Sequence, residues 1–225
     1  IHGGLTDLGR KAIEEMNLHG IMVDISHAAK TTTLQAIAHS KAPVIASHSA
    51  VVAKRDHTRN LDDETLLALK ENGGVIQIVA FDAYAKDNDA QREEVAELRE
   101  ELGMPPFRRG QPRDTSPEAQ EKQKVFQERA AEIAKKYTPA DVSDMIDHLD
   151  HAVKLIGIDH VAISSDFDGG GGVVGWNDAS ETFNVTLELV RRGYSKEDIE
   201  KLWSGNTLRV WSEVERIAKE LQEAK

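Results

Sequence analysis

Four short apolar segments recur along the chain, and each ends in polar residues. They cover residues 21–27, 43–49, 75–81 and 161–168. Amphipathic spacing predicts helices between and after these segments, over residues 5–19, 31–39, 62–71, 139–156 (capped by Thr138), 180–192, 195–203 and 207–221. Apolar strands that alternate with helices indicate a parallel sheet covered by helices, either an open doubly wound sheet or a (β/α) barrel.

A charged stretch separates the third apolar segment from the fourth. Residues 82–137 are rich in Glu, Gln, Lys and Arg, and Pro105-Pro106 and Gly110-Gln111-Pro112 break them into helical pieces. Strand and helix patterns continue on both sides. We therefore predict a single domain over residues 1–225 with a mostly helical insertion at about 82–137.

Composition narrows the function classes. The chain has 39 acidic and 28 basic residues, a formal charge of −11, which argues against nucleic acid as a partner. With no cysteine, any metal ion must be held by His, Asp or Glu. No apolar run reaches the roughly 18 residues of a membrane span, so we expect a soluble protein, cytoplasmic or periplasmic. Because Ile1 is not a starting Met, we expect a trimmed amino terminus.

Three polar side chains stand where predicted strands end. His27, His48 and Asp166 close the first, second and fourth apolar segments, and in parallel α/β folds the carboxyl ends of the strands carry the site. Imidazole and carboxylate on separate strands suit a zinc-type ion with open positions for water and substrate. The pattern predicts a hydrolytic metal site, and the competing interpretation is three hydrogen-bonded core residues.

Other residues carry weaker signals. Arg59 lies on the loop after the second strand, where it could clamp a carboxylate with two hydrogen bonds, although loop arginines are usually solvated. His148 and His151 fit an ordinary helix face better than a metal site. The glycines at 169–172 lack the lysine of a nucleotide-binding loop, which favours a mobile loop beside the site.

A set of motifs in a fixed order resembles the membrane (renal) dipeptidase family of zinc peptidases. The resemblance runs from Gly3 to about Val214, apart from residues 82–137. It is carried by Gly4-Leu5-Thr6, Glu15-Met16-Asn17, Val23-Asp24-Ile25-Ser26-His27, Ser47-His48-Ser49, Arg59-Asn60, Glu71-Asn72-Gly73-Gly74, Gly157-Ile158-Asp159-His160 and Ser165-Asp166-Phe167-Asp168-Gly169.

The resemblance implies a parallel (β/α)8 TIM-type barrel with two zinc ions and a metal-bridging hydroxide that cleaves dipeptides. It implies that His27 and His48 bind one zinc ion and that Asp166 handles the proton of the attacking water and the leaving amine. Arg59 would hold the substrate carboxylate, and Asp168 would contact the residues that bind the metal ions rather than the ions themselves.

The family's remaining metal ligands should precede Gly4. We therefore expect this chain to supply the carboxyl-terminal four β/α units plus the C-terminal helices, with an amino-terminal half as its partner; homodimerisation stays open. Two alternatives also stay open: a related barrel amidohydrolase acting on a cyclic amide or ester, and a non-catalytic fragment or binding module.

Overall fold

The computed structural model describes residues 3–105 and 114–224, and these form two compact units. The sheet unit contains the described residues up to Lys86 and from Ala140 onward, and the hairpin unit covers Asp87–Pro139. The prediction of a single domain with an insertion at 82–137 stays a prediction. The expected helix break at Gly110 and Pro112 lies outside the described residues.

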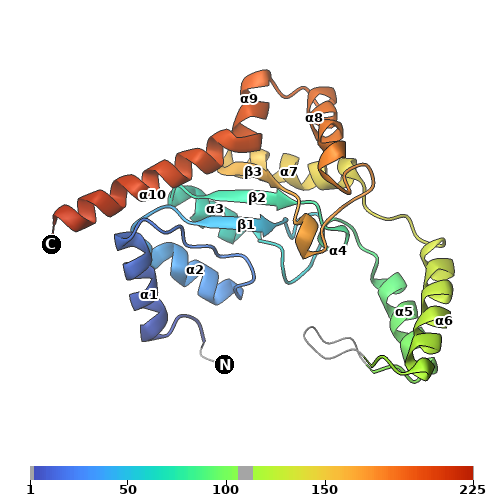
Figure 1. The fold of residues 1–225 in the computed structure, drawn as a ribbon. Coiled ribbons are helices and arrows are strands. Elements are labelled where there is room, and N and C mark those ends of the chain that lie inside the picture. The colour runs from blue at the N-terminus through green and yellow to red at the C-terminus, as the bar shows by residue number, and fades with distance from the viewer. Residues whose placement is uncertain (1–2, 106–113, 225) are drawn as a thin grey trace. The chain divides into compact units, whose positions relative to one another are not determined.

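A three-stranded parallel sheet forms the centre of the sheet unit (Figure 1). Its strands are β1 (Ile45–Ser49), β2 (Val75–Val79) and β3 (Val161–Ser164), in the order β1-β2-β3. This confirms the predicted α/β class with a parallel sheet, while the eight-stranded barrel stays a prediction. Two strands end earlier than predicted, because Phe81 already caps the short helix α4 (Asp82–Ala85) and Phe167 begins a 3-10 turn.

The first predicted strand, residues 21–27, is wrong in extent. The segment is extended and joins β1 through one parallel bridge between Asp24 and Ile45. The carbonyl of Val23 accepts from the amide of Ile45 at 2.9 Å, and the amide of Ile25 donates back to the Ile45 carbonyl at 2.8 Å. Pairing then stops, because the chain turns away after Ile25 with the amide of Ala28 bonded to the Ile25 carbonyl.

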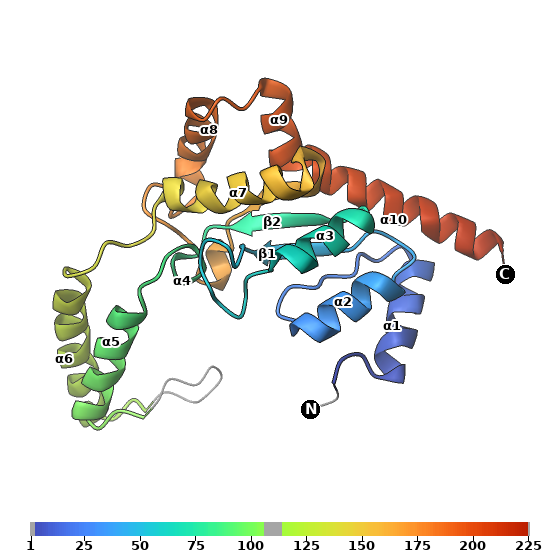
Figure 2. The same cartoon turned by 180° about the vertical axis from the view of Figure 1, so that it is seen from behind.

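Five helices follow one another in a row, each contacting the next (Figure 2). They are α1 (Asp7–Leu18), α2 (Lys30–His39), α3 (Asp63–Glu71), α7 (Val142–Ile156) and α8 (Thr182–Arg191). Their bounds lie within three residues of the prediction. The predicted cap of α7 is wrong: Asp141, not Thr138, caps it, because Asp141 and Asp144 satisfy each other's backbone amides in a capping box.

The carboxyl-terminal segments are helical as predicted. Ser195 and Asp198 form a capping box at the start of α9 (Lys196–Glu200). One π-helical turn, η4 (Lys201–Gly205), joins α9 to α10 (Asn206–Glu223), and shorter 3-10 turns are η1 (Ile158–His160), η2 (Phe167–Gly169) and η3 (Ala179–Glu181). None of the helices in the described parts of the chain has the length and apolar character to cross a bilayer.

Buried side chains cover both faces of the sheet. Ile76 and Ile78 of β2 belong to the main core, with leucines of α3 and most of the inner face of α7. Val75 belongs to a second cluster, in which Val210 and Val214 of α10 pack. Because successive residues of a strand point to opposite faces, the helix row and α10 cover different sides of β2. This packing fixes the strands whose carboxyl ends carry the candidate site.

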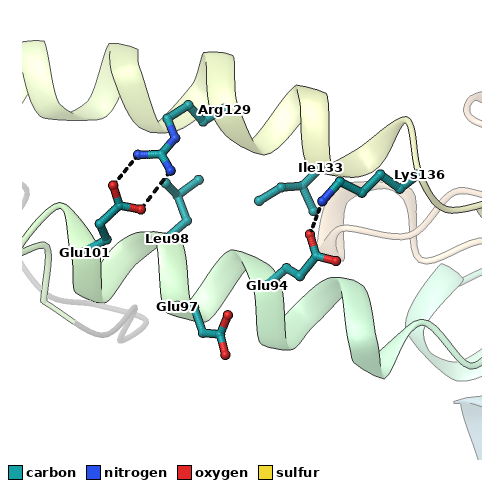
Figure 3. A pocket seen from close by; sticks show the side chains of 7 residues that line it. All are labelled: Glu94, Glu97, Leu98, Glu101, Arg129, Ile133 and Lys136. Atoms are coloured by element: carbon teal, nitrogen blue, oxygen red, sulfur yellow. Dashed lines mark hydrogen bonds and ion pairs between the residues drawn. The ribbon is translucent and has the colours of Figure 1, made fainter.

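The hairpin unit consists of α5 (Asp89–Glu101) and α6 (Pro117–Ala134), which pack against each other. Leu98 is the buried residue of α5, and α6 has none. Ion pairs join the helices at the surface: Arg129 binds Glu101 with two hydrogen bonds of 2.7 Å, and Lys136 donates to Glu94 at 2.6 Å (Figure 3).

Candidate metal centre

Two histidines from separate segments meet in the sheet unit. The Nε2 atoms of His27 and His48 lie 2.7 Å apart, and the ring planes are tilted by 56°. His27 is exposed and His48 is half-buried, so the point between the rings lies at the surface. The sequence predicted that these two side chains converge, and the structure brings them into direct contact.

An irregularity in β1 determines where His48 points. Ala46 pairs with Ile76 and Ser49 pairs with Ile78, so three steps along β1 match two steps along β2. Two residues of β1, Ser47 and His48, therefore lie opposite the single residue Gln77 of β2. Bulges of this kind re-aim a side chain and are common beside active sites. On the far side of the ring, Nδ1 of His48 lies 2.7 Å from the hydroxyl oxygen of Ser47.

A tight turn positions His27. Its backbone has a φ of 68°, a left-handed conformation that costs energy for a residue with a Cβ. The preceding amide, that of Ser26, donates to the carboxylate of Asp24 at 2.9 Å. Burial alone would raise the pKa of the Asp24 carboxyl, but hydrogen bonds from Ser47 and Ser26 outweigh it and hold this pKa below its usual value.

The charges that act on the pKa of His27 include that of Asp166. Loss of solvent is the largest cause that lowers the pKa of His27, and the positive charges of Arg59 and His48 lower it further. The carboxylates of Asp24 and Asp166 act in the opposite direction. Asp166 therefore lies within electrostatic reach of the histidine pair, although the structure records no hydrogen bond between them.

Glycines let the chain fold closely around Asp166. This residue follows β3, has a left-handed φ of 54° and is half-buried. A Cβ on Gly171 would lie 2.0 Å from the Ser165 carbonyl oxygen, and one on Gly169 would lie 2.3 Å from Oδ1 of Asp166. Close approach of Ser165 and Asp166 thus explains the glycines at 171 and 169. Asp168 lies on η2 and is exposed, and its supporting role stays a prediction.

Arg59 lies at the same rim, the edge of the sheet formed by the carboxyl ends of the strands, where His48 is found. Its Nη2 donates to the backbone carbonyl of His48 at 3.1 Å, and its guanidinium carbon lies 5.3 Å from the ring centre of Tyr84. Its Nε is buried and has no hydrogen-bond partner among the residues that the structure describes. A guanidinium has five N–H donors, so the Nη atoms of Arg59 keep donors for an anion. Sequence reasoning missed Tyr84, because a tyrosine beyond a strand end carries no signal until its neighbours are known.

The paired imidazoles fit a zinc-type ion. Two nitrogens bound to one tetrahedral zinc at about 2.0–2.1 Å stand about 3.3 Å apart, so the two Nε2 atoms would need to separate by about 0.6 Å from their 2.7 Å. Within residues 3–105 and 114–224, however, no group of three or more His, Asp or Glu is arranged to hold a metal ion. A metal ion between the two rings would therefore have His27 and His48 as its ligands among the described residues.

The structure gives His148 and His151 structural contacts rather than a place in the candidate metal centre. His148 is fully buried; its Nδ1 accepts from the amide of Val51 at 3.1 Å and its Nε2 lies 2.9 Å from the Ala85 carbonyl oxygen. His151 lies 2.8 Å from Asp63. Four of the five charged side chains that line the hollow between α5 and α6 already pair with each other, as Arg129–Glu101 and Lys136–Glu94 (Figure 3).

Comparison with models of protein families shows to which family this chain belongs. The model of the membrane dipeptidases, peptidase family M19, matches residues 1–225. The chain belongs to the membrane dipeptidase family. Dipeptidase aclJ of Aspergillus oryzae is 31% identical over 221 residues, which cover 98% of this chain and 41% of that protein. Dipeptidase 3 of Rattus norvegicus is 30% identical over 215 residues, 95% of this chain and 34% of that protein.

Solved structures agree with the membrane dipeptidase assignment. The probable dipeptidase PvdM from Pseudomonas aeruginosa has a TM-score of 0.78 and 40% identity, over 96% of this chain and 56% of that chain. A Rhodobacter sphaeroides metallo peptidase liganded with a phosphinate mimic of L-Ala-D-Ala shares the fold, with a TM-score of 0.68 and 23% identity over 94% of this chain and 47% of that one. The chain spans less than half the length of the two curated relatives above.

Proposed function

We propose that the protein is a zinc-dependent dipeptidase and that this chain carries one histidine pair, the carboxylate clamp and the proton-transfer group of its site. The observation that carries the proposal is the meeting of His27 and His48 at 2.7 Å, with Arg59 bonded to the His48 carbonyl. The relatives aclJ and Dipeptidase 3 are named dipeptidases, and PvdM is described as a probable one, which supports the reaction class.

His27 and His48 would hold the ion through their Nε2 atoms. Bound zinc polarises a carbonyl and lowers the pKa of a coordinated water to about 7. The space next to the two Nε2 atoms is accessible to water and substrate, because His27 is exposed and its Nε2 faces that of His48. The remaining ligands of a site for two ions would come from outside the described residues.

Arg59 would select substrates with a free carboxylate. A planar guanidinium binds a carboxylate with two parallel hydrogen bonds, and the Tyr84 ring beside it limits where the guanidinium can move. A dipeptide places its terminal carboxylate one residue from the bond that is cut. Because Arg59 is bonded to the backbone of His48 itself, a clamp at this position would favour dipeptides over longer peptides.

Asp166 would hold and move the proton. Its carboxylate lies within electrostatic reach of His27, and its position after β3 places it on the same rim. A carboxylate there can accept a proton from the attacking water and pass it to the leaving amine. The glycines at 169 and 171 let the backbone wrap Asp166 closely.

The test is a set of substitutions in the full-length protein. His48→Ala should remove most of one zinc per molecule and most turnover, since it removes a ligand. His151→Ala is the matched control, because His151 bonds Asp63 on α3 and lies outside the site. Unchanged zinc content in His48→Ala would contradict the proposal and favour a non-catalytic binding module.

A second variant tests substrate class. Arg59→Ala should lower kcat/KM for dipeptides by roughly 10–100-fold, the value of hydrogen bonds to a charged group, and should leave dipeptide amides nearly unaffected. Equal losses on both substrates would contradict the clamp. Hydrolysis of cyclic amides or esters in preference to dipeptides would favour the amidohydrolase alternative.

A further inference from the structure

The carboxylate of Asp24 lies at the centre of the hydrogen bonds behind the histidine pair. Its Oδ1 accepts from two backbone amides, those of Ser26 at 2.9 Å and Ser47 at 3.1 Å. Its Oδ2 accepts from the hydroxyl of Ser47 at 2.6 Å. One side chain thus contacts the segments that carry both histidines.

The Ser47 hydroxyl fixes the tautomer of His48. A hydroxyl has one proton, and that of Ser47 is donated to Asp24, whose ionised carboxylate can only accept. The contact of 2.7 Å between the Ser47 oxygen and Nδ1 of His48 must then be donated by Nδ1–H. Consequently Nε2 of His48 carries the lone pair, and this atom faces His27.

Asp24 also organises the segment of His27. The bond from the Ser26 amide to Oδ1 closes the turn in which His27 adopts its left-handed φ. The Ser26 hydroxyl oxygen accepts from the backbone amide of His48 at 3.1 Å. Hydrogen bonds from Ser47 to Asp24 and from His48 to Ser26 therefore join the two segments that carry the histidines.

We propose that Asp24 is the positioning residue of the histidine pair, acting on the His27 turn through its Oδ1 and on the His48 ring through Ser47. The inference rests on the proposed function, in which these rings bind zinc. It assigns Asp24 no contact with substrate. Partners of this kind hold a ligand ring in one orientation, and their loss typically weakens metal binding by about 10–100-fold.

Asp24→Asn makes the decisive variant, because it reverses the polarity of the chain of hydrogen bonds. Two backbone amides point at Oδ1, so the amide oxygen of Asn must occupy that place and its NH2 must replace Oδ2. The NH2 donates to the Ser47 oxygen, whose proton then turns to Nδ1 of His48. The His48 ring is left with its proton on Nε2, where zinc would bind.

The experiment reads the tautomer directly, in protein without metal. Long-range ¹⁵N–¹H correlation spectra, recorded above the pH at which histidines protonate, distinguish Nδ1–H from Nε2–H. Wild type should show His48 as Nδ1–H, Asp24→Asn as Nε2–H, and Ser47→Ala as a mixture. Ser47→Thr, which keeps a hydroxyl, should restore the wild-type state.

Ser49→Ala is the matched control. Ser49 flanks His48 on the other side and is buried, and its hydroxyl has no hydrogen-bond partner in the described part of the chain. Its removal should leave the His48 tautomer unchanged. Zinc affinity, measured by competition with a chelator, should fall about 10–100-fold in Asp24→Asn and Ser47→Ala, and stay at the wild-type value in Ser49→Ala.

The outcomes separate this inference from the proposed function. A His48 ring that stays Nδ1–H in both Asp24→Asn and Ser47→Ala overturns the role of Asp24, even if wild type binds zinc at His48. Zinc affinity that is the same in wild type and His48→Ala overturns the proposed function, and then the tautomer result decides the role of Asp24 by itself. Circular dichroism confirms that each variant is folded.

Discussion

The sheet unit and the hairpin unit hold their helices by different means. In the sheet unit, the helix row and α10 bury two apolar clusters against a parallel sheet. In the hairpin unit, the described helices bury Leu98 and are joined at the surface by Arg129–Glu101 and Lys136–Glu94. Buried apolar area is the larger source of stability, and exposed ion pairs contribute little.

The sheet unit also carries the candidate site. Polar groups of the sheet unit have partners far away in sequence: His148 binds Val51 and Ala85, and Arg192 binds Asp147 and Asp150 at 2.6 Å. Burial opposes the charge of Arg192, but these carboxylates outweigh it and raise its pKa. A site needs side chains held to a fraction of an ångström, and the candidate site of His27 and His48 lies in this unit.

The largest expected effect comes from the core of the sheet unit. Leu149 of α7 is fully buried, and Leu149→Ala should lower the free energy of unfolding by about 3–5 kcal/mol, because it removes buried methyl groups and leaves a cavity. Denaturant titration followed by tryptophan fluorescence measures it, since Trp176, Trp203 and Trp211 all belong to the sheet unit. A loss below about 1 kcal/mol would contradict the assignment of this core.

Next comes the buried histidine. His148→Ala leaves the Val51 amide and the Ala85 carbonyl without partners and should cost about 2–4 kcal/mol in the same titration. His151→Ala, one turn further along α7 and paired with Asp63, is the control and should change little. If both variants lose the same free energy, His148 is not the anchor that the structure shows.

Leu98→Ala sharpens the contrast between the units. Leu98 is 3% exposed, and its truncation should cost about 2–3 kcal/mol, confined to the hairpin unit. Amide hydrogen exchange should show lost protection in α5 and α6, while the fluorescence midpoint and dipeptide turnover stay at wild-type values. A shifted fluorescence midpoint would show that the two units unfold together.

Acid should weaken the sheet unit through His148. Burial lowers its pKa below the ordinary value of 6.5, so the unfolded chain takes up a proton at a higher pH than the folded chain. Stability is therefore complete above about 6.5 and is lost as pH falls toward the folded pKa. His148→Gln should remove this part of the slope, and a difference between wild type and variant that stays constant from pH 7 to pH 5 would contradict it.

The smallest effect is expected from the ion pairs of the hairpin unit. Arg129 and Glu101 keep about half of their side-chain surface exposed, 48% and 58%. Arg129→Ala should leave thermal unfolding and turnover unchanged within error, since exposed pairs are screened by water and salt. A clear drop in the melting temperature of the hairpin unit would show that the pairs, rather than Leu98, hold it.

Sequence patterns predicted the parts that depend on burial. Apolar runs located β1, β2 and β3, because burial of a strand on both faces leaves a continuous apolar signal. Amphipathic periodicity located the helices, and the structure shows Thr6 and Ser195 as the caps of α1 and α9. The order of polar residues at strand ends also indicated that His27 and His48 would meet, which the structure confirms.

What the sequence could not predict depends on contacts between segments. Residues 21–27 read as a strand, but the bond from Ser26 to Asp24 ends the pairing with β1 in a turn. The bulge at Ser47 and His48 leaves no mark in an apolar run. Hydrogen bonds between Asp24 and Ser47 join residues 23 positions apart, and no local pattern reports such a pair.

One measurement tests the central claim that His27 and His48 share one metal ion. Zinc is titrated into the ¹⁵N-labelled full-length protein while the imidazole nitrogens of every histidine are followed. The account predicts that the Nε2 signals of His27 and His48 shift together at the same ratio of zinc to protein, while those of His148 and His151 stay in place. A shift at only one of the two rings, or at neither, would contradict it.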